Sequence, residues 1–465
     1  MVRRINARSS AAIAAAKATG VMLRLAGRGG TALPGLVAER IDPALVAVLA
    51  HNLARGSALV TGTNGKTTTT RLVAAALRAG GLAPVHNTAG SNLMRGLAAT
   101  LASAARFDGR LPAGFRSVGV FEVDEAVAPQ AARALRPRVV VITNLFRDQL
   151  DRYAELDTVA ALWREMIASL PGATVVLNAD DPLVGALPAP PSGRRLLYGI
   201  ADPAVAVDAA GTADSIWCPA CGGRLAFRAR WFSHLGDYSC PSCGYARPPL
   251  DLAAVEVRCL GFEGSRLLVR SAAGEVALAL PLPGLYNVSN ALAALGGALA
   301  MGVPSAVAAR ALASAGTAFG RAERLVVAGR EVAILLIKNP AGADQALRTI
   351  QAEEAAPSVL FALNDRIADG RDVSWIWDVD FERLAGRHGP ITVTGDRAAE
   401  LALRLKYAGA DDGVEVEPHL ERAVDRALRR GAGRLYVLPT YTALLALHRI
   451  FARRAGAQQF WERRG

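Results

Sequence analysis

The chain has 465 residues, of which 52% are hydrophobic and 20% are charged, and its formal net charge is +12. This composition excludes an intrinsically disordered chain, and the length suits two or three domains that each bury a core. The excess of basic residues suits an anionic partner such as a nucleotide, a nucleic acid or an acidic lipid surface. A general preference of the sequence for arginine accounts for this excess equally well.

The N-terminal segment, residues 1–54, is rich in alanine and arginine. Its apolar stretch contains Lys17, which argues against a secretory signal and leads us to expect a cytoplasmic protein. No uninterrupted run of about 18 apolar residues occurs in the chain, so we expect no membrane-spanning helix. We expect the segment to pack as a helix on the main domain, with contact to a membrane surface as the alternative.

Residues 61–70 read TGTNGKTTTT and lie between an apolar run at 58–61 and a run of helical composition at 67–79. At such a junction, unpaired backbone N–H groups and the helix dipole converge on an anion. The pattern predicts a nucleoside triphosphate site in which Lys66 contacts the β- and γ-phosphates and the Thr67 hydroxyl holds Mg²⁺. Val60 stands where the strict pattern has its first glycine, so a plain Gly/Thr-rich loop is the alternative. Only four of the 53 basic residues are lysines, and the presence of one here favours the phosphate site.

Strands are expected at 58–61, 117–122, 139–143 and 174–177, with helices between them at 67–79 and 159–170. This alternation predicts a parallel sheet with helices on both faces. Acidic clusters at 120–125, 143–152 and 177–182 follow three of these strands. Carboxylates at the carboxyl edge of the sheet can carry Mg²⁺ against a triphosphate, whereas the simpler interpretation is that they cap the next helix.

Four of the five cysteines form two CxxC pairs, Cys218/Cys221 and Cys240/Cys243, separated by 18 residues and each followed by glycine. This spacing is typical of a zinc ribbon with a closed, structural Zn²⁺ site. Two disulfides are the alternative, and they require an oxidising compartment. Cys259 is expected to be a buried small hydrophobe.

The alternation restarts after residue 325, with strands expected at 332–337, 358–363, 391–393 and 435–438 and helices at 344–352, 397–407 and 420–430. We therefore predict an α/β protein with three parts. These are an N-terminal segment (1–54), a central domain with a P-loop, a parallel sheet and an inserted four-cysteine ribbon (55–324, insertion 215–248), and a C-terminal, Rossmann-like α/β domain (325–465).

These motifs resemble the Mur ligase family of ATP-dependent peptidoglycan enzymes. The matching segments are GTNGKT (62–67), Glu122, TN (143–144) with Asp148 and Asp151, NADD (178–181), GLYNVSN (284–290) and GRAE (320–323). The resemblance implies that ATP and its phosphates contact Gly62, Thr63, Asn64, Gly65, Lys66, Thr67, Thr68, Asn287, Asn290 and Arg321. It implies that Mg²⁺ is held by Thr67, Glu122 and Asp148.

The chain departs from most Mur ligases in three respects. Gln149 stands where histidine is usual, no lysine lies between Lys66 and Lys338 to be carbamylated, and only about fifty residues precede the phosphate loop, too few for a UDP-binding domain. One branch of the family, the MurT subunits of lipid II isoglutaminyl synthase, is similar in these respects and in its cysteine ribbon. It is also similar in the segments FRDQLDRY (146–153), NDRIADGRDVSWIWD (364–378), LKYAG (405–409) and LPTYTA (438–443).

This resemblance implies amidation of the D-glutamate α-carboxylate in lipid II through an acyl phosphate, at the inner face of the membrane. It implies a heterodimer with a GatD-like glutaminase, to which this chain lends an aspartate; Asp372 is our first choice, followed by Asp369 and Asp378. The simpler interpretation is that these aspartates cap turns and that Trp375 and Trp377 belong to the core.

Two rival functions remain. One is an amino-acid-adding Mur ligase or a folylpolyglutamate-type ligase, against which the ribbon argues. The other is a zinc-ribbon nucleic-acid-binding NTPase, against which the lack of a basic stripe interleaved with aromatic residues argues, so we expect no nucleic-acid partner.

Overall fold

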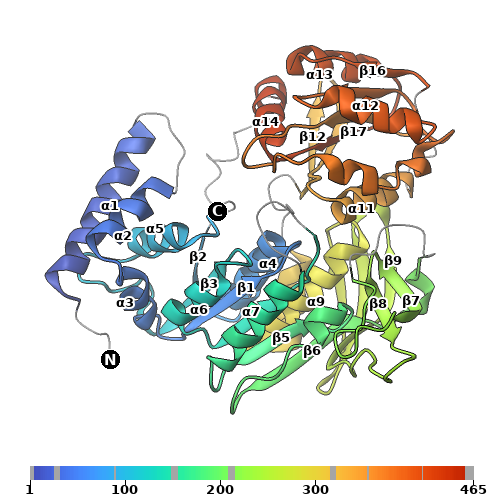
Figure 1. Cartoon of the computed structure of the whole chain (residues 1–465). Helices are drawn as coiled ribbons and strands as arrows, with labels where there is room; N and C mark the ends of the chain where they lie inside the picture. Colours follow the sequence, from blue (N-terminus) through green and yellow to red (C-terminus); the bar gives the residue numbers. More distant parts are fainter. Residues whose placement is uncertain are drawn as a thin grey trace.

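The computed structural model describes residues 5–25, 32–87, 91–147, 156–207, 215–314, 321–352, 356–410 and 412–455. Two sheets dominate the molecule (Figure 1), and a two-stranded hairpin, β7 (Ala226–Phe232) with β8 (Leu235–Ser239), forms the third. Within the described residues, no helix is both long enough and apolar enough to cross a membrane.

The larger sheet has nine strands in the order β11-β10-β9-β6-β5-β4-β1-β3-β2. Seven of them, from β2 to β9 in this order, run parallel, and β10 and β11 extend the sheet as antiparallel strands. The strand bounds are Ser57–Thr61 (β1), Ala83–His86 (β2), Ser117–Glu122 (β3), Val139–Ile142 (β4), Thr174–Asn178 (β5), Arg194–Ile200 (β6), Leu252–Cys259 (β9), Ser265–Ser271 (β10) and Gly274–Leu280 (β11).

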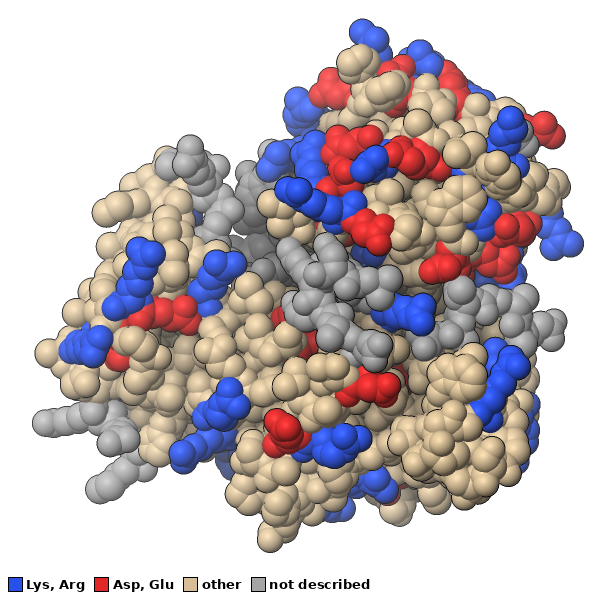
Figure 2. All heavy atoms as spheres, in the orientation of Figure 1, with Lys and Arg blue, Asp and Glu red and all other residues tan. Residues whose placement is uncertain are grey.

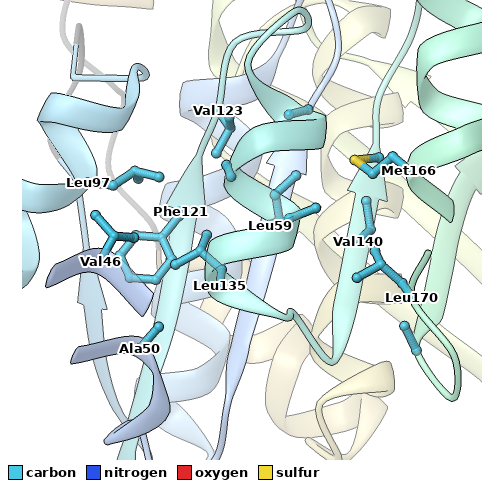
Figure 3. Close-up of a cluster of buried hydrophobic side chains, with 14 of the residues drawn as sticks. Val46, Ala50, Leu59, Leu97, Phe121, Val123, Leu135, Val140, Met166 and Leu170 are labelled. Carbon is cyan, nitrogen blue, oxygen red and sulfur yellow. The ribbon is translucent and has the colours of Figure 1, made fainter. Parts of the chain in front are cut away.

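The central strands are buried on both faces, as expected for a parallel sheet covered by helices on each side. Side chains alternate between the two faces. Leu59, Phe121 and Val140 meet one set of helices (Figure 3), whereas Val60 and Val120 meet the other set. The first set comprises α3 (Leu45–His51), α5 (Met94–Ala104), α6 (Ala128–Leu135) and α7 (Leu156–Ala168), and the second comprises α4 (Lys66–Ala79), α9 (Leu285–Ala300) and α10 (Ser305–Ala313).

The N-terminal helices α1 (Ala7–Leu25) and α2 (Ala32–Ile41) form a lobe at one end of this sheet and pack on α5 (Figure 1). Ile13 and Ala16 of α1 are buried in the same core as Ala38 of α2 and Leu97 of α5. The expectation that the N-terminal segment packs as a helix on the main domain is therefore confirmed.

The smaller sheet has six strands in the order β12-β13-β17-β14-β15-β16, and all of them except the antiparallel β12 are parallel. It confirms the second α/β unit and adds strands β12 and β16, which the sequence patterns did not indicate. Its elements are β12 (Arg321–Val327), β13 (Arg330–Leu335), α11 (Pro340–Gln351), β14 (Ser358–Ala362), β15 (Ile391–Thr394), α12 (Ala398–Tyr407), β16 (Val414–Val416), α13 (Leu420–Arg429), β17 (Leu435–Pro439) and α14 (Tyr441–Ala455).

The cysteine insertion is anchored to the large sheet by the acidic pair that follows β5. The Asp180 carboxylate accepts hydrogen bonds from the Ile200 backbone N–H at 2.8 Å and from the Arg247 guanidinium at 2.7 Å. Asp181 lies 3.4 Å from Nε2 of His234, and both side chains are fully buried. Asp181 also caps the short helix α8 (Pro182–Gly185), because its carboxylate accepts hydrogen bonds from the backbone N–H groups of Leu183 and Val184. The contacts of this third acidic cluster therefore favour the simpler interpretation, that its carboxylates have a structural role.

Replacing Arg247 with alanine should lower the free energy of unfolding by about 3 kcal/mol or more, because it leaves the buried Asp180 carboxylate without a counter-charge. Burial already raises the pKa of Asp180 from 3.8 to about 6. The folded state therefore binds a proton on Asp180 more tightly than the unfolded state does. At low pH this protonation removes the uncompensated charge of the variant and so reduces its loss of stability. The destabilisation should therefore be larger at pH 8 than at pH 5 when followed by urea unfolding.

Arg228→Ala is the matched control, because Arg228 lies on the same insertion but its ion pair with Asp237 is exposed. It should change the free energy of unfolding by less than about 1 kcal/mol. Equal losses for the two variants would contradict the anchoring role of Arg247.

Candidate functional site

The turn between β1 and α4 leaves no room for side chains at two glycines. Gly62 and Gly65 have positive φ angles of 127° and 86°. A Cβ atom would lie 2.2 Å from the Thr143 hydroxyl oxygen at Gly62 and 1.9 Å from the Asn290 amide oxygen at Gly65. No side chain of the described residues caps the first turn of α4. This helix end therefore carries the partial positive charge that attracts an anion.

The two residues after β4 hold the loop in this shape. The Thr143 hydroxyl donates a hydrogen bond to the Asn64 carbonyl oxygen at 2.7 Å, and the Asn144 amide oxygen accepts one from the Asn64 backbone N–H at 2.8 Å. The Asn144 carbonyl oxygen accepts another from the Thr63 backbone N–H at 2.9 Å. The loop is therefore organised before any ligand binds.

Lys66 is almost completely buried beneath this loop. Its ammonium group donates hydrogen bonds to the carbonyl oxygens of Gly62 at 2.6 Å and Thr63 at 3.1 Å, and it forms an ion pair with Glu125 at 3.0 Å. The positive charge is thus fixed at the centre of the loop. Glu125 was not chosen from the sequence, although it lies in the acidic cluster after β3, only three residues beyond Glu122.

The expected Mg²⁺ ligands are placed only in part. Thr67 is half-buried in the first turn of α4, and Glu122 is buried at the end of β3, where its backbone N–H and carbonyl bond the side chain of Asn87. Asp148 lies outside the described residues. Thr68 is buried in the first turn of α4.

The two asparagines expected near the nucleotide lie on α9, beneath the loop. Asn290 packs against Gly65, and its amide donates a hydrogen bond to the Asn287 side-chain oxygen at 3.1 Å. Asn287 in turn donates to the Pro283 carbonyl oxygen at 2.7 Å. Both side chains are buried, and the packing of Asn290 against Gly65 supports the loop from below. Arg321 begins β12, but its side chain lies outside the described residues.

The small sheet contributes two residues to the loop, both from the segment after β13. The Lys338 ammonium donates a hydrogen bond to the Thr63 carbonyl oxygen at 3.2 Å, and the Asn339 amide donates to the Asn64 side-chain oxygen at 3.1 Å. The carboxyl ends of parallel strands in both sheets therefore meet at residues 63–64. Sequence reasoning did not choose these residues; the scarcity of lysine in the chain was the available signal.

Tyr441, at the start of α14, lies between acidic groups of the two sheets. Burial raises the pKa of its phenol, and the nearby charges of Asp369 and Glu122 raise it further. Tyr441 therefore remains a neutral phenol at ordinary pH.

The three aspartates of 364–378 differ in exposure. Asp369 is buried and accepts hydrogen bonds from the Thr442 backbone N–H at 2.7 Å and from the Thr442 hydroxyl. Asp372 and Asp378 are exposed. The Asp372 carboxylate accepts a hydrogen bond from the Ser374 N–H at 2.8 Å, and its bonds to Ser374 lower its pKa.

An exposed aromatic pair lies beside these aspartates. The Trp377 ring is 48% exposed and contacts the 73% exposed Tyr407 ring of α12, with ring centroids 5.7 Å apart. Trp377 is therefore not a core residue, although the buried Arg404 guanidinium lies over one face of its ring. Trp375 is half-buried and packs against the core of the small sheet, as the simpler interpretation expects.

The four cysteines of the insertion come together. Their sulfur atoms lie within 4.8 Å of one another, with Cys218–Cys243 at 3.6 Å and Cys221–Cys240 at 3.5 Å. A disulfide needs about 2.05 Å, whereas tetrahedral zinc with bonds of about 2.3 Å separates its sulfurs by about 3.8 Å. The geometry therefore fits a four-thiolate metal site. The fifth cysteine, Cys259, is exposed at the end of β9, so the expectation that it is buried is wrong.

Family models match two segments of the chain. The Mur ligase middle domain matches residues 60–215, and the MurT ligase C-terminal domain matches residues 336–444. The first covers the phosphate loop and the second covers Lys338 and the aspartates.

Two curated relatives match nearly the whole chain, and both are described as subunit MurT of lipid II isoglutaminyl synthase (glutamine-hydrolyzing). The protein from Streptococcus pneumoniae is 33% identical over 97% of this chain and 98% of its own length. The protein from Staphylococcus aureus is 32% identical over 90% of this chain and 92% of its own length.

Solved structures share the fold at lower identity. A pseudomurein peptide ligase type C from Methanothermus fervidus has a TM-score of 0.64 and 21% identity, covering 87% of this chain and 80% of that one. Folylpolyglutamate synthase from Mycobacterium tuberculosis has a TM-score of 0.60 and 17% identity, covering 95% of this chain and 99% of that one. At these identities the likeness supports the fold alone.

Proposed function

The chain belongs to the Mur ligase family, within its branch of MurT subunits, and from this premise we propose that it uses ATP to amidate the D-glutamate α-carboxylate of lipid II. The observation that carries the proposal is the meeting of both sheets at residues 63–64. There the ammonium groups of Lys66, from one sheet, and Lys338, from the other, both donate hydrogen bonds to carbonyl oxygens of the phosphate-type loop.

We assign the ATP phosphates to residues 62–68, with Lys66 and Lys338 supplying positive charge. Mg²⁺, when bound, offsets phosphate charge, and the hydroxyl of Thr67 and the carboxylates of Glu122 and Asp148 are the oxygen ligands that we assign to it. We also keep Asn287, Asn290 and Arg321 as nucleotide-binding residues, with Asn290 acting through its packing against Gly65.

The reaction requires two transfers. A carboxylate oxygen of the substrate attacks the γ-phosphorus of ATP, so that ADP leaves and an acyl phosphate forms. Ammonia then attacks the acyl carbon, phosphate leaves, and loss of a proton completes the amide. Lys66 is desolvated, and Gly62, Thr63 and Glu125 accept hydrogen bonds from its ammonium group, so we assign it the role of a positive charge held beneath the transferring phosphoryl group.

Replacing Lys66 with alanine should reduce ATP-dependent amidation of lipid II by about 100-fold or more, because the fixed charge beneath the phosphates is lost. Ammonium chloride should serve as the nitrogen source, so that the assay does not depend on a partner. The readout is the mass of the amidated product.

Lys406→Ala is the matched control, because it removes an ammonium group from the exposed surface of α12. Its rate should equal that of the wild type. A Lys66→Ala variant with unchanged turnover would remove the phosphate assignment.

We propose that a glutaminase subunit supplies the ammonia and docks on the small sheet near Asp372. The support is an exposed carboxylate with a lowered pKa, next to the exposed pair Trp377 and Tyr407. A carboxylate that stays ionised can orient the histidine of a Cys–His pair on a partner. Asp369 is less suitable, since it is buried and bonded to Thr442.

Replacing Asp372 with asparagine should reduce glutamine-dependent amidation by about 100-fold or more, because an amide does not hold the histidine in the correct tautomer. Amidation driven by ammonium chloride should stay unchanged. Both rates should be measured on the purified complex.

Asp378→Asn is the matched control, because Asp378 is exposed on the same segment. If this variant lost the glutamine-dependent rate and Asp372→Asn kept it, the role would pass to Asp378. Equal loss of both rates in Asp372→Asn would point to a fault in the ligase site.

We propose that Cys218, Cys221, Cys240 and Cys243 hold one structural Zn²⁺. Backbone N–H groups of Ala220 and Gly223 lie 3.4 Å from the sulfurs of Cys218 and Cys221, respectively, as they do in a turn that stabilises thiolates. All four ligand positions are taken by sulfur, so no position is left open for catalysis.

The freshly purified protein should contain one zinc ion per chain by elemental analysis, and Cys221→Ser should lose it and unfold at a lower temperature. Cys259→Ser is the matched control and should retain the metal, because Cys259 lies outside the cluster. Reduced wild-type protein without zinc would refute the site.

A further inference from the structure

The free ends of α1 and α2 carry apolar side chains that no other described element covers. Val21, Met22 and Leu25 of α1 are 46%, 67% and 84% exposed, and Leu33 of α2 is 46% exposed. The two helix ends adjoin, since a Cβ at Gly20 would lie 4.0 Å from Cγ of Pro34. We call Val21, Met22, Leu25 and Leu33 the apolar tip.

The structure separates the apolar tip from the packed half of α1. The buried residues of α1 are Ser9, Ala12, Ile13 and Ala16, all in the first half of the helix. After Gly20 the helix keeps an apolar sequence, but none of its side chains is buried. Core packing therefore does not account for the apolar side chains at this end.

The charged residues at the start of the sequence all have one sign. The first 38 residues contain six basic residues and no acidic residue, which amounts to half of the net charge of +12. Arg24 is exposed within the apolar tip itself. The first acidic side chains of the chain are Glu39, which is half-buried, and Asp42, which is buried and accepts a hydrogen bond from the Ser9 hydroxyl. In Figure 2 the lobe at the left shows mainly uncharged side chains, with basic side chains and a smaller acidic group among them.

We propose that the apolar tip inserts shallowly into an anionic lipid bilayer and so holds the chain at the membrane surface. Exposed apolar side chains next to arginine are the combination that binds the boundary between headgroups and acyl chains. The inference deepens the proposed function, on which it rests, because a substrate with a lipid anchor must be met at a bilayer.

A protein occupant fits these observations less well. The surface that we assign to the glutaminase lies on α12 and residues 372–378 of the small sheet, whereas α1 lies at the other end of the molecule (Figure 1). A small apolar area with basic surroundings suits anionic lipid, whereas a second copy would bring like charges together.

The test uses the full chain without partner or substrate, floated with phosphatidylcholine vesicles containing about one third phosphatidylglycerol. The wild type should float with these vesicles, more weakly at higher salt and much less with phosphatidylcholine alone. The double variant Met22→Asp/Leu25→Asp should reduce the bound fraction about tenfold. Phe115→Asp is the matched control, since Phe115 is 74% exposed directly before the start of β3 and lies outside the apolar tip. This variant should bind vesicles like the wild type.

Equal binding of the double variant and the wild type, or no binding of either, would overturn the proposal. So would a wild type that is dimeric by light scattering and becomes monomeric in the double variant, because the apolar tip would then belong to a second copy.

A second assay separates this proposal from the proposed function. With ammonium chloride as the nitrogen source, the double variant should lose amidation of lipid II in vesicles and keep amidation of a lipid-free muropeptide. Wild-type protein that binds vesicles but amidates neither substrate would refute the function and leave the membrane surface standing. Wild-type protein that amidates lipid II without binding vesicles would refute the membrane surface and leave the proposed function standing.

Discussion

The backbone at residues 62–65 passes so close to its neighbours that two positions accept only glycine. Gly62 lies against Thr143 and Gly65 against Asn290, so the end of β4 and the start of α9 both depend on the path of this loop. The same path brings two carbonyl oxygens onto the Lys66 ammonium. Any side chain added at either glycine would shift the loop, its lysine and the two elements that support it together.

The second sheet depends on the same loop. Lys338 and Asn339 reach Thr63 and Asn64 from the carboxyl end of β13, and Asn339 also accepts a hydrogen bond from Gly342 at the first turn of α11. A displacement of the small sheet would therefore withdraw a cation from the loop. In the proposed reaction, this arrangement links the binding of phosphate to the position of the sheet that carries Asp372.

Acidic side chains at equivalent strand ends serve different purposes. Glu125, after β3, forms an ion pair with the loop lysine, whereas Asp180 and Asp181, after β5, contact Arg247 and His234 of the cysteine insertion. The insertion is thus joined to the nucleotide-binding sheet through buried polar contacts. Removing one partner of such a buried pair lowers the free energy of unfolding strongly, because the remaining charge stays buried without a counter-charge.

The sequence by itself determined the features that depend on neighbours in the chain. These are the strand–loop–helix junction with its glycines, the CxxC pairs, and most strands and helices, because spacing and periodicity are local properties. It missed β2 and β6, which are short or begin with arginines, it placed Cys259 inside, and it left open whether Trp377 belongs to the core. Only the tertiary structure decided which acidic group meets Lys66, which carboxylates anchor the insertion, and which lysine reaches Thr63 across 275 residues of chain. These choices depend on how two sheets and their helices pack, and no local pattern carries that information.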